Sequence, residues 1–408
     1  MFPVQMNEMC NALSRLVGRL FPTLRGGPRA RSGPVSRVAG GPRALRAVAR
    51  LPGMLTRGDR EPLRHHGDVD AEPGLLDFAV NVRLQRPPEW LRDRLAAALD
   101  DLGRYPSAAD DLAARTAVAE RHGRDPEDVL LLGGAAECFA LLPLLRPAKA
   151  ALVHPSFTEP EYALRSAGVP VQQVVLPDHR LDPALVPADA DLVVLGNPTN
   201  PTSLLHPAAA IRELVRPGRL VVVDEAFLDA VPGEPESLAP ERIPGVLVVR
   251  SLTKMWGLPG LRAGYALGEP ELLRELAAPR PHWPLGTLAL EAIRACCSPE
   301  ALAESAAAAA ELDRLRAGLA AELAEIPGIR VIGPARAPFL LLDVHNGAEV
   351  RAALRERGIA VRRGDTFPGL GTDHLRVAVR DAERNAALAG ALRELLGQGE
   401  DQRGVRIG

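Results

Sequence analysis

Residues 246–267 read VLVVRSLTKMWGLPGLRAGYAL. The run Val246–Val249 is short, apolar and rich in β-branched residues, which predicts a strand buried on both faces of a sheet. The chain then passes through Ser251-Leu-Thr-Lys254 into a loop rich in glycine, and a second strand is expected at Arg262–Leu267. Ligands of α/β sheets bind beyond the carboxyl ends of the strands, so Lys254 stands where chemistry is expected.

A lysine at position 254 is unusual for this chain. Lysine and arginine together number 49, and only Lys149 and Lys254 are lysines. Arginine serves for solvation and ion pairs, but only a primary amine can lose its proton and form an imine. Lys149 lies between a Pro-Ala pair and two alanines, and we expect it to be a solvated loop residue. Lys254 is therefore the candidate for covalent chemistry.

Short apolar runs alternate with helical patterns on either side of this stretch. The other strands are expected at Val129–Leu132, Ala151–His154, Val171–Leu176, Leu192–Leu195 and Leu220–Val223. Helices are expected at Ala108–His122, Ala136–Leu145, Pro160–Ala167 and Ala208–Val215. This alternation predicts an α/β domain built on a mainly parallel, seven-stranded sheet.

The pattern changes after residue 298. A long alanine-rich helix is expected over 298–325, followed by strands at Arg330–Val331, Phe339–Asp343, Ile359–Arg362 and Leu375–Val379, with helices at Ala348–Arg357 and Ala382–Leu396. This order predicts a smaller C-terminal α+β domain. We therefore expect an extension over 1–60, an N-terminal segment over 61–105 that packs with the small domain, a large domain over 106–285, a small domain over 286–398 and a tail over 399–408.

Composition narrows the classes of function. The net charge of −2 argues against a nucleic-acid partner. The sequence holds no run of 18 or more consecutive apolar residues, so we expect no membrane-spanning helix. The four cysteines show no metal-ligand spacing, so we expect no metal and a cytoplasmic location. Residues 1–60 are rich in Arg, Gly and Pro, which predicts disorder apart from a possible short helix at Asn11–Phe21.

Three further motifs follow expected strands. Asp224 ends the strand Leu220–Val223 and is suited either to pairing with a cationic ring nitrogen or to capping the next helix. Asn197, in Gly-Asn-Pro-Thr-Asn-Pro-Thr, is suited either to donating a hydrogen bond or to a rigid turn. Gly133-Gly134 precedes a helix and offers free backbone N–H groups to a phosphate, although a tight turn explains it equally well.

Ser251-Leu-Thr-Lys254 also matches the Ser-x-x-Lys motif of β-lactamases. That reading requires the partner tripeptides Ser-Asp-Asn and Lys-Thr-Gly, and neither occurs in this sequence. In their order along the chain, the four motifs instead resemble those of the fold-type I pyridoxal-phosphate (PLP) enzymes, in the aminotransferase class I/II family, over roughly residues 63–398. This resemblance implies the PLP-dependent transferase fold.

Within that family, the resemblance is closer to the cobalamin-pathway threonine-phosphate decarboxylases, which are relatives of histidinol-phosphate aminotransferase. The segments that carry it are Asp77-Phe78-Ala-Val-Asn81, Arg104-Tyr105-Pro106, Pro155-Ser-Phe157, Asp224-Glu-Ala-Phe227, Trp283, Val361-Arg362, Phe367-Pro-Gly-Leu370 and Leu375-Arg376-Val-Ala-Val-Arg380.

The resemblance implies a role for each matching position. Lys254 would carry PLP as a Schiff base and move protons, and Asp224 would hold the pyridine N–H. The remaining cofactor contacts would be Ala135, Ala136, Phe157, Asn197, Phe227, Ser251, Arg262 and Tyr105, the last reaching in from a second subunit of a homodimer. The substrate, a small phosphorylated amino acid, would contact His65, His66, Gly67, Asn81, Asn197, Arg362 and Arg376.

The sequence departs from the family at several of these positions. Ala135-Ala136 replaces the usual Ser or Thr, and His65-His66-Gly67 replaces His-Gly-Gly, which leaves open which histidine faces the substrate. The leading hypothesis is decarboxylation of O-phospho-L-threonine in cobalamin biosynthesis. The alternative is an aminotransferase of the histidinol-phosphate type, and a third hypothesis is a non-catalytic protein with a degenerate PLP fold.

Overall fold

A mainly parallel seven-stranded sheet forms the centre of the computed structural model, which describes the backbone of residues 63–404 and the side chains of residues 63–397. Its order is β2-β8-β7-β6-β5-β3-β4. The strands are β2 Val129–Leu132, β3 Ala150–His154, β4 Val171–Val175, β5 Leu192–Gly196, β6 Leu220–Asp224, β7 Val246–Ser251 and β8 Gly264–Leu267. Only β8 runs antiparallel to its neighbours, so the expected fold class is confirmed.

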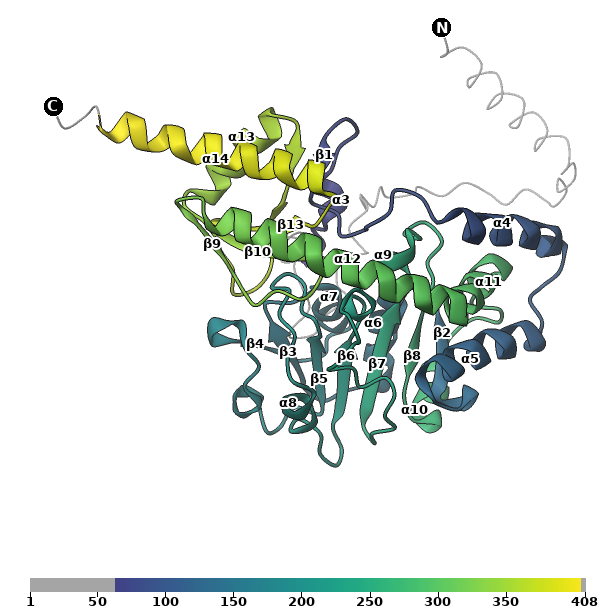
Figure 1. Cartoon of the computed structure of the whole chain (residues 1–408). Helices are drawn as coiled ribbons and strands as arrows, with labels where there is room; N and C mark the ends of the chain where they lie inside the picture. The colour runs from purple at the N-terminus through teal and green to yellow at the C-terminus, as the bar shows by residue number, and fades with distance from the viewer. Residues whose placement is uncertain (1–62, 405–408) are drawn as a thin grey trace, which may run out of the picture. The chain divides into compact units, whose positions relative to one another are not determined.

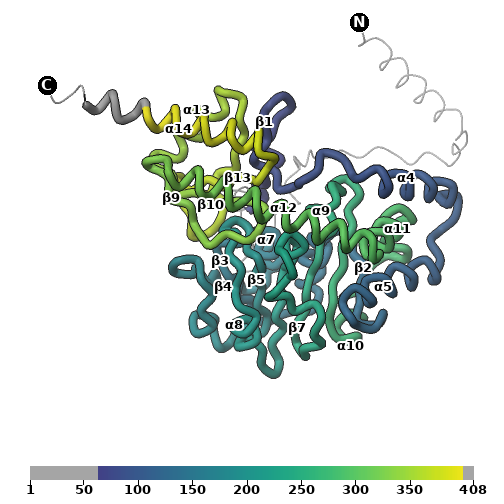
Figure 2. Tube along the Cα trace, viewed as in Figure 1, coloured from purple at the N-terminus to yellow at the C-terminus, as the bar shows by residue number. Residues whose placement is uncertain are grey.

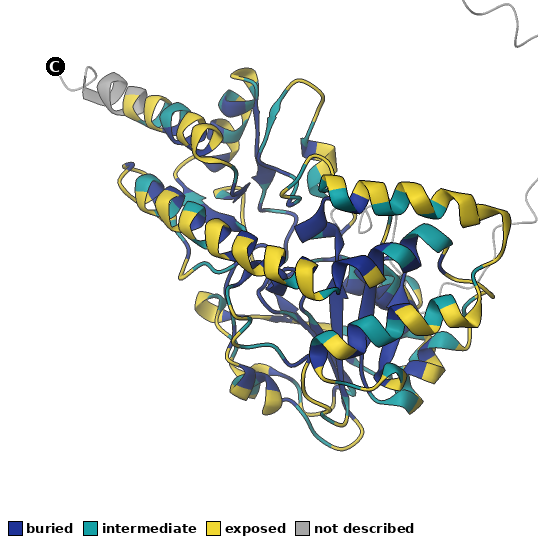
Figure 3. Cartoon of the chain, turned by 45° about the vertical axis from the view of Figure 1, so that its right-hand side comes forward, coloured by how far each residue is buried: buried dark blue, intermediate teal, exposed yellow. Residues whose placement is uncertain are grey.

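Alternate residues of these strands enter two different hydrophobic clusters. Val221 and Val223 of β6 belong to the cluster on one face, whereas Val222 belongs to the cluster on the other. Side chains of a strand point alternately to the two faces of its sheet, so both faces are covered. Figure 3 shows the strands as buried ribbons between partly exposed helices. The prediction of strands buried on both faces is confirmed for β6 and for most of the sheet.

Helices cover both faces of the sheet (Figure 1). They are α4 Glu89–Ala97, α5 Ala108–His122, α6 Ala135–Leu141, α7 Glu159–Ser166, α8 Ala208–Arg212, α9 Thr253–Trp256, α10 Pro270–Ala277 and α11 Thr287–Cys296. The helix expected over Ala136–Leu145 changes to a 3₁₀ turn at Leu142–Leu145, since Pro143 lacks the N–H that an α-helix needs there. The sequence pattern had not indicated α4, α10 or α11.

A second sheet of four strands follows, in the order β12-β13-β10-β9. Its strands are β9 Ile329–Val331, β10 Phe339–Val344, β12 Arg362–Arg363 and β13 His374–Ala378, and its helices are α13 Gly347–Glu356 and α14 Ala382–Gly404. The long helix α12, Pro299–Ala324, contacts both β9 and the 3₁₀ turn Leu228–Ala230 that follows β6. It therefore links the two sheets.

The N-terminal segment joins the smaller sheet region. Strand β1, Leu76–Asp77, pairs in parallel with β11, Ile359–Ala360, so the expected single strand Ile359–Arg362 is divided between two partners. Figure 2 shows β1 beside α13 and α14, from the other end of the chain. The domain bounds expected from the sequence stay predictions, and the extension 1–60 with its helix Asn11–Phe21 lies outside the described residues.

No helix in the described part of the chain combines the length and the apolar character that crossing a membrane requires. The same residues hold no group of three or more His, Cys, Asp or Glu side chains placed to bind a metal ion.

Candidate active site

A cavity of about 330 Å³ lies beyond the carboxyl ends of the parallel strands. The loops after β3, β5, β6 and β7 bring side chains to one side of it. The N-terminal segment and the smaller sheet supply the opposite wall. Its volume falls in the range of small-molecule sites. The predicted site residues that line it are His66, Gly67, Asn81, Phe157, Phe227, Lys254, Arg262, Arg362 and Arg376.

Lys254 lies in the short helix α9, which starts two residues after β7. Burial, together with the positive charges of Arg376 and Arg262, lowers the pKa of its amine to about 8, against the opposing charge of Asp224. The Nζ atom lies 5.6 Å from the centroid of the Phe227 ring. A lowered pKa raises the share of neutral amine, the form that adds to a carbonyl group.

Asp224 is the last residue of β6, between Gly196 of β5 and Val249 of β7. Burial raises the pKa of its carboxyl to about 6, although a hydrogen bond from the backbone N–H of Ala226 (3.0 Å) and the charge of Lys254 act to lower it. Among the described residues, no cation pairs directly with this carboxylate. It is therefore an anionic position that a cationic N–H group would complement.

The two Asn-Pro pairs of the loop after β5 have different surroundings. The amide of Asn197 donates to the carbonyl of His206 (3.1 Å) and accepts from its N–H (2.7 Å), so it fastens the loop to itself. Asn200 lines the cavity, and its Oδ1 accepts a hydrogen bond of 2.6 Å from Nη1 of Arg376. This geometry favours Asn200 over Asn197, the residue chosen from the sequence, for contact with a bound ring or substrate.

Arg362 and Arg376 are directly opposite each other in the antiparallel pair β12·β13. Burial lowers the pKa of Arg362 to about 10 and that of Arg376 to about 9, in the second case with the charge of Arg362 adding to the effect. Like charges opposite each other destabilise a sheet. With Lys254 on the facing side they make the cavity strongly cationic, which suits an anionic ligand.

The two adjacent histidines have different partners. His66 lines the cavity, with its ring 5.3 Å from the Phe157 ring and its Nε2 2.6 Å from Glu159. His65 is absent from the lining, and its Nε2 lies 3.2 Å from Asp70. The structure thus places His66, rather than His65, where a substrate would meet it.

Two buried polar side chains of the lining have no hydrogen-bond partner. Both amide atoms of Asn81 and the hydroxyl of Thr253 are unpaired. Unpaired buried polar atoms cost free energy, so they indicate a position that a ligand completes. Sequence reasoning had named Asn81 but missed Thr253, and the only signal for Thr253 was its place beside Lys254.

One corner of the site gathers backbone N–H groups and a guanidinium. Helix α6 begins at Ala135 without a side-chain cap, after Gly134 at φ +85°. A Cβ added at Gly134 would lie 2.6 Å from Nη2 of Arg262, so only glycine permits this approach. Ser251 enters the same corner, because it pairs with Gly264, whose added Cβ would lie 3.1 Å from the nitrogen of Ala135. Such a corner suits a phosphate group.

Tyr105 lies away from the cavity in the single chain. Its side chain is 71% exposed and stacks on Trp283, with the ring centroids 4.1 Å apart. Six other predicted site residues also lie outside the lining, and of these Ala135, Asp224 and Ser251 lie next to it. The six are His65, Ala135, Ala136, Asn197, Asp224 and Ser251.

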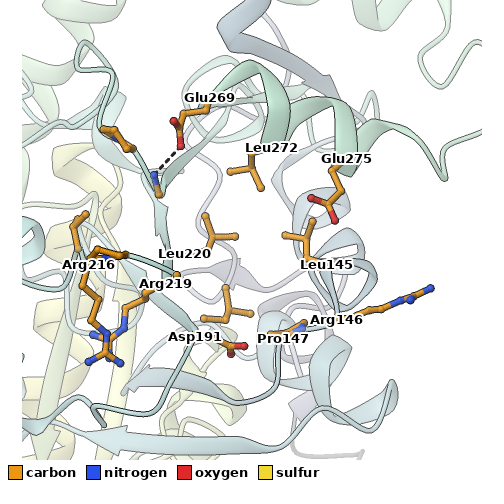
Figure 4. Close-up of a pocket in the computed structure, with 16 residues that line it drawn as sticks. Leu145, Arg146, Pro147, Asp191, Arg216, Arg219, Leu220, Glu269, Leu272 and Glu275 are labelled. Atoms are coloured by element: carbon orange, nitrogen blue, oxygen red, sulfur yellow. Dashed lines mark hydrogen bonds between the residues drawn. The ribbon is translucent and has the colours of Figure 1, made fainter.

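A larger cavity, of about 780 Å³, lies at the opposite, amino-terminal edge of the strands (Figure 4). It opens near the starts of β5 and β6, and Glu269 there accepts a hydrogen bond from the N–H of Gly245 (2.9 Å). The buried guanidinium of Arg219 donates to the backbone carbonyls of Ala190, Pro187 and Leu214. The polar groups of Arg219 and Glu269 are thus already paired, and none of the predicted site residues is among the lining of this cavity.

Comparison with known proteins agrees with this geometry. Residues 73–392 match the family model described as "Aminotransferase class I and II". A histidinol-phosphate aminotransferase of Mycobacterium tuberculosis is 56% identical over 344 residues, covering 83% of this chain and 92% of that protein. A threonine-phosphate decarboxylase of Salmonella typhimurium is 31% identical over 340 residues, covering 79% and 91%.

The fold is also that of solved relatives. A crystal structure of histidinol-phosphate aminotransferase from Sinorhizobium meliloti, in complex with pyridoxal-5'-phosphate, superposes with a TM-score of 0.66 at 23% identity, covering 78% of this chain and 90% of that one. At this identity the likeness shows the fold alone.

Proposed function

The chain belongs to the aminotransferase class I and II family, and we propose that within it the protein is an aminotransferase acting on histidinol phosphate. One observation carries this choice: the relative named for that activity is 56% identical over nearly its whole length. The decarboxylase preferred from the sequence is at 31% identity. We therefore prefer the aminotransferase of the histidinol-phosphate type to the decarboxylase. A role in cobalamin biosynthesis belongs to the decarboxylase hypothesis alone.

The residues present fit PLP, the cofactor of this family. Asp224 offers a carboxylate that has no ion-pair partner among the described residues for the pyridine N–H, and Phe157 offers an aromatic face. Arg262 with the N–H groups of Ala135 and Ala136 would hold the phosphate, and we add the unpaired Thr253 hydroxyl to Ser251 there. When bound, PLP supplies an electron sink for a bond broken at the substrate α-carbon.

Lys254 would serve as the proton carrier of amino transfer. An amine with a pKa of about 8 is partly neutral at physiological pH, so its Nζ can accept a proton from carbon and return it at another atom. The nearby positive charges of Arg376 and Arg262 keep that amine from holding its proton too tightly. Asn200 and Arg376, joined by their hydrogen bond, would fix the substrate beside it.

The cationic cavity supports a phosphorylated substrate. Arg362 and Arg376 lie side by side, and His66 and Asn81 line the same cavity. A guanidinium binds a phosphate through two parallel hydrogen bonds, and the low dielectric of the cavity strengthens them. These groups support histidinol phosphate, whose phosphate ester is on the carbon next to the one that carries the amine.

The test measures both candidate reactions on one preparation. Purified protein loaded with PLP is given histidinol phosphate with 2-oxoglutarate, and separately O-phospho-L-threonine, while glutamate formation and carbon dioxide release are followed. We expect glutamate with the first pair only, and none from Lys254→Ala. Carbon dioxide from phosphothreonine without amino transfer would return the decarboxylase to first place. Failure to retain PLP would support the non-catalytic hypothesis.

We further propose a homodimer, with a cytoplasmic location staying a prediction. The support is a group of exposed apolar side chains on one region of the chain, namely Leu99, Leu102, Tyr105 and Trp283. Large exposed apolar patches mark interaction sites, and the 71% exposed Tyr105 is the residue expected to cross to a partner. Sedimentation analysis of wild type and Tyr105→Asp tests this, and a monomeric wild type would contradict it.

A further inference from the structure

Arg380 stands just after β13 and binds the backbone of a distant segment. Its Nε donates to the carbonyl of Asp77 (2.7 Å), its Nη2 to that of Val80 (2.7 Å) and its Nη1 to that of Val82 (2.8 Å). All three nitrogens of the guanidinium are thus used on one stretch of six residues. The carboxylate of Asp77 lies 3.6 Å away and adds an ionic contact.

The stretch that Arg380 binds is a wall of the candidate active site. Ala79, Val80, Asn81 and Val82 all line the 330 Å³ cavity, and they belong to neither a helix nor a strand. Local support is limited to Asp77, whose Oδ1 accepts from the N–H groups of Ala79 (2.7 Å) and Val80 (3.0 Å). An irregular wall of this kind depends on bonds from elsewhere to hold one conformation.

Asn81 makes the position of this wall matter. It lies between two of the bound carbonyls, those of Val80 and Val82, and its buried amide has no partner in the protein. An unpaired side-chain amide binds a ligand tightly only if the backbone that carries it is held within a fraction of an ångström of the productive position. Arg380 itself does not line the cavity, so it reaches a ligand only through this wall.

We propose that Arg380 is a positioning residue, which holds Val80–Val82 so that Asn81 meets the amino substrate. The proposal rests on the cavity being the substrate site of the proposed aminotransferase. It assigns to a residue of the C-terminal region, some 300 residues along the chain from Asn81, a part in substrate affinity. The cofactor corner at Gly134 and Arg262 is built without it.

The chain contains a matched control. Arg219 is buried and, like Arg380, uses its guanidinium on backbone carbonyls, among them those of Ala190, Pro187 and Leu214, but it lies at the opposite edge of the sheet. Arg219→Gln therefore reports the general cost of losing such a guanidinium. Arg380→Gln shows, beyond that general cost, the effect of losing the bonds to the cavity wall. Arg380→Lys keeps the positive charge, but its ammonium group lacks the planar arrangement of donors of a guanidinium.

Three measurements on the PLP-loaded variants test the inference. For Arg380→Gln we expect KM for the amino substrate to rise about tenfold or more with kcat changing less, since each tenfold is 1.4 kcal/mol of binding. We expect backbone hydrogen exchange over 79–82 to quicken about tenfold, and the visible absorbance of bound PLP to stay unchanged. Arg380→Lys should recover part of both losses, and Arg219→Gln should show neither.

The exchange measurement separates this inference from the proposed function. If wild type uses neither histidinol phosphate nor phosphothreonine, the proposed function fails, yet exchange over 79–82 still decides whether Arg380 holds the wall. Unchanged exchange there in Arg380→Gln, or an equal rise in Arg219→Gln, overturns the inference. A KM that stays at the wild-type value despite quickened exchange also overturns it, because the wall would then not govern affinity.

Discussion

Replacing Arg250 by methionine should destabilise the protein in a pH-dependent way. Arg250 is 1% exposed, and its guanidinium lies 3.0 Å from Glu225, 2.5 Å from Asp229 and 2.5 Å from Glu234. Burial alone would lower its pKa, but these carboxylates raise it above its ordinary value. The residue follows Val249 and precedes Ser251 in β7.

The size of the loss follows from what methionine leaves behind. Removing one partner of a buried ion pair costs about 3–5 kcal/mol, because the remaining charge is uncompensated. Arg121 still pairs with Asp229 (2.9 Å), which leaves fully buried Glu225 as the main unpaired group and favours the lower end. At about 2.1 cal/mol/K per residue, the unfolding entropy of a chain this long is about 0.7 kcal/mol/K, so a loss of about 3 kcal/mol lowers Tm by about 4 °C.

The sign of the pH effect is set by Glu225. Burial already raises the pKa of its carboxyl, and Arg250 acts to lower it. Without Arg250 the folded-state pKa rises further above the unfolded value, so the folded state binds the extra proton and stability falls as pH increases. The deficit of Arg250→Met relative to wild type should therefore be larger at pH 8 than at pH 5.5.

Urea and thermal unfolding at both pH values measure this. The control is Arg314→Met, which removes an exposed guanidinium paired with Glu311, where such pairs contribute about 0–1 kcal/mol. A deficit for Arg250→Met below about 1 kcal/mol, or one that is the same at both pH values, would refute the reasoning that an uncompensated buried carboxylate dominates.

Three shorter predictions concern the site. The rate of PLP binding to cofactor-free protein should rise with pH around a midpoint near 8, as the Lys254 amine becomes neutral, and level off above it; absorbance time courses whose rates show a midpoint at pH 10 would contradict this. Gly134→Ala should weaken PLP binding about tenfold or more in an absorbance titration, because its Cβ meets Arg262 at a φ that costs about 1–3 kcal/mol; unchanged affinity would count against a phosphate corner there. Asn200→Ala should alter substrate affinity, whereas Asn197→Ala should lower Tm, since its amide holds the backbone of His206; equal effects in both assays would remove the distinction.

The strands were predictable because burial on both faces leaves a local mark. Runs such as Val246–Val249 and Leu220–Val223 are apolar at every position, and each was placed within two residues of its observed bounds. Lys254 and Asp224 follow from these strands, since a residue after a parallel strand lies at the ligand edge. Helix α4 was not predicted, because Leu91 is its only buried residue and it shows little apolar periodicity.

The finer assignments depend on contacts that no local pattern records. Asn197 and Asn200 occur in the same Asn-Pro-Thr context, and Arg376, 176 residues further along, determines which one faces the cavity. The choice between His65 and His66 likewise depends on Asp70 and Glu159. The division of Ile359–Arg362 into two strands required knowing that Leu76–Asp77 pairs with its first half.

The pairing of β1 with β11 determines when, during synthesis of the chain, the wall of the cavity can form. A ribosome releases the N-terminal segment first, yet its partner strand Ile359–Ala360 and the clamping Arg380 come last. At about 5–20 residues per second, the chain after β8 takes on the order of ten seconds to emerge. Throughout that interval the nascent chain already holds all seven strands of the large sheet and Lys254, while one wall of the cavity still lacks the bonds of Arg380. The cavity can therefore close only after β11 and Arg380 have been synthesised. A chain truncated before them would carry the Lys254 amine without this wall.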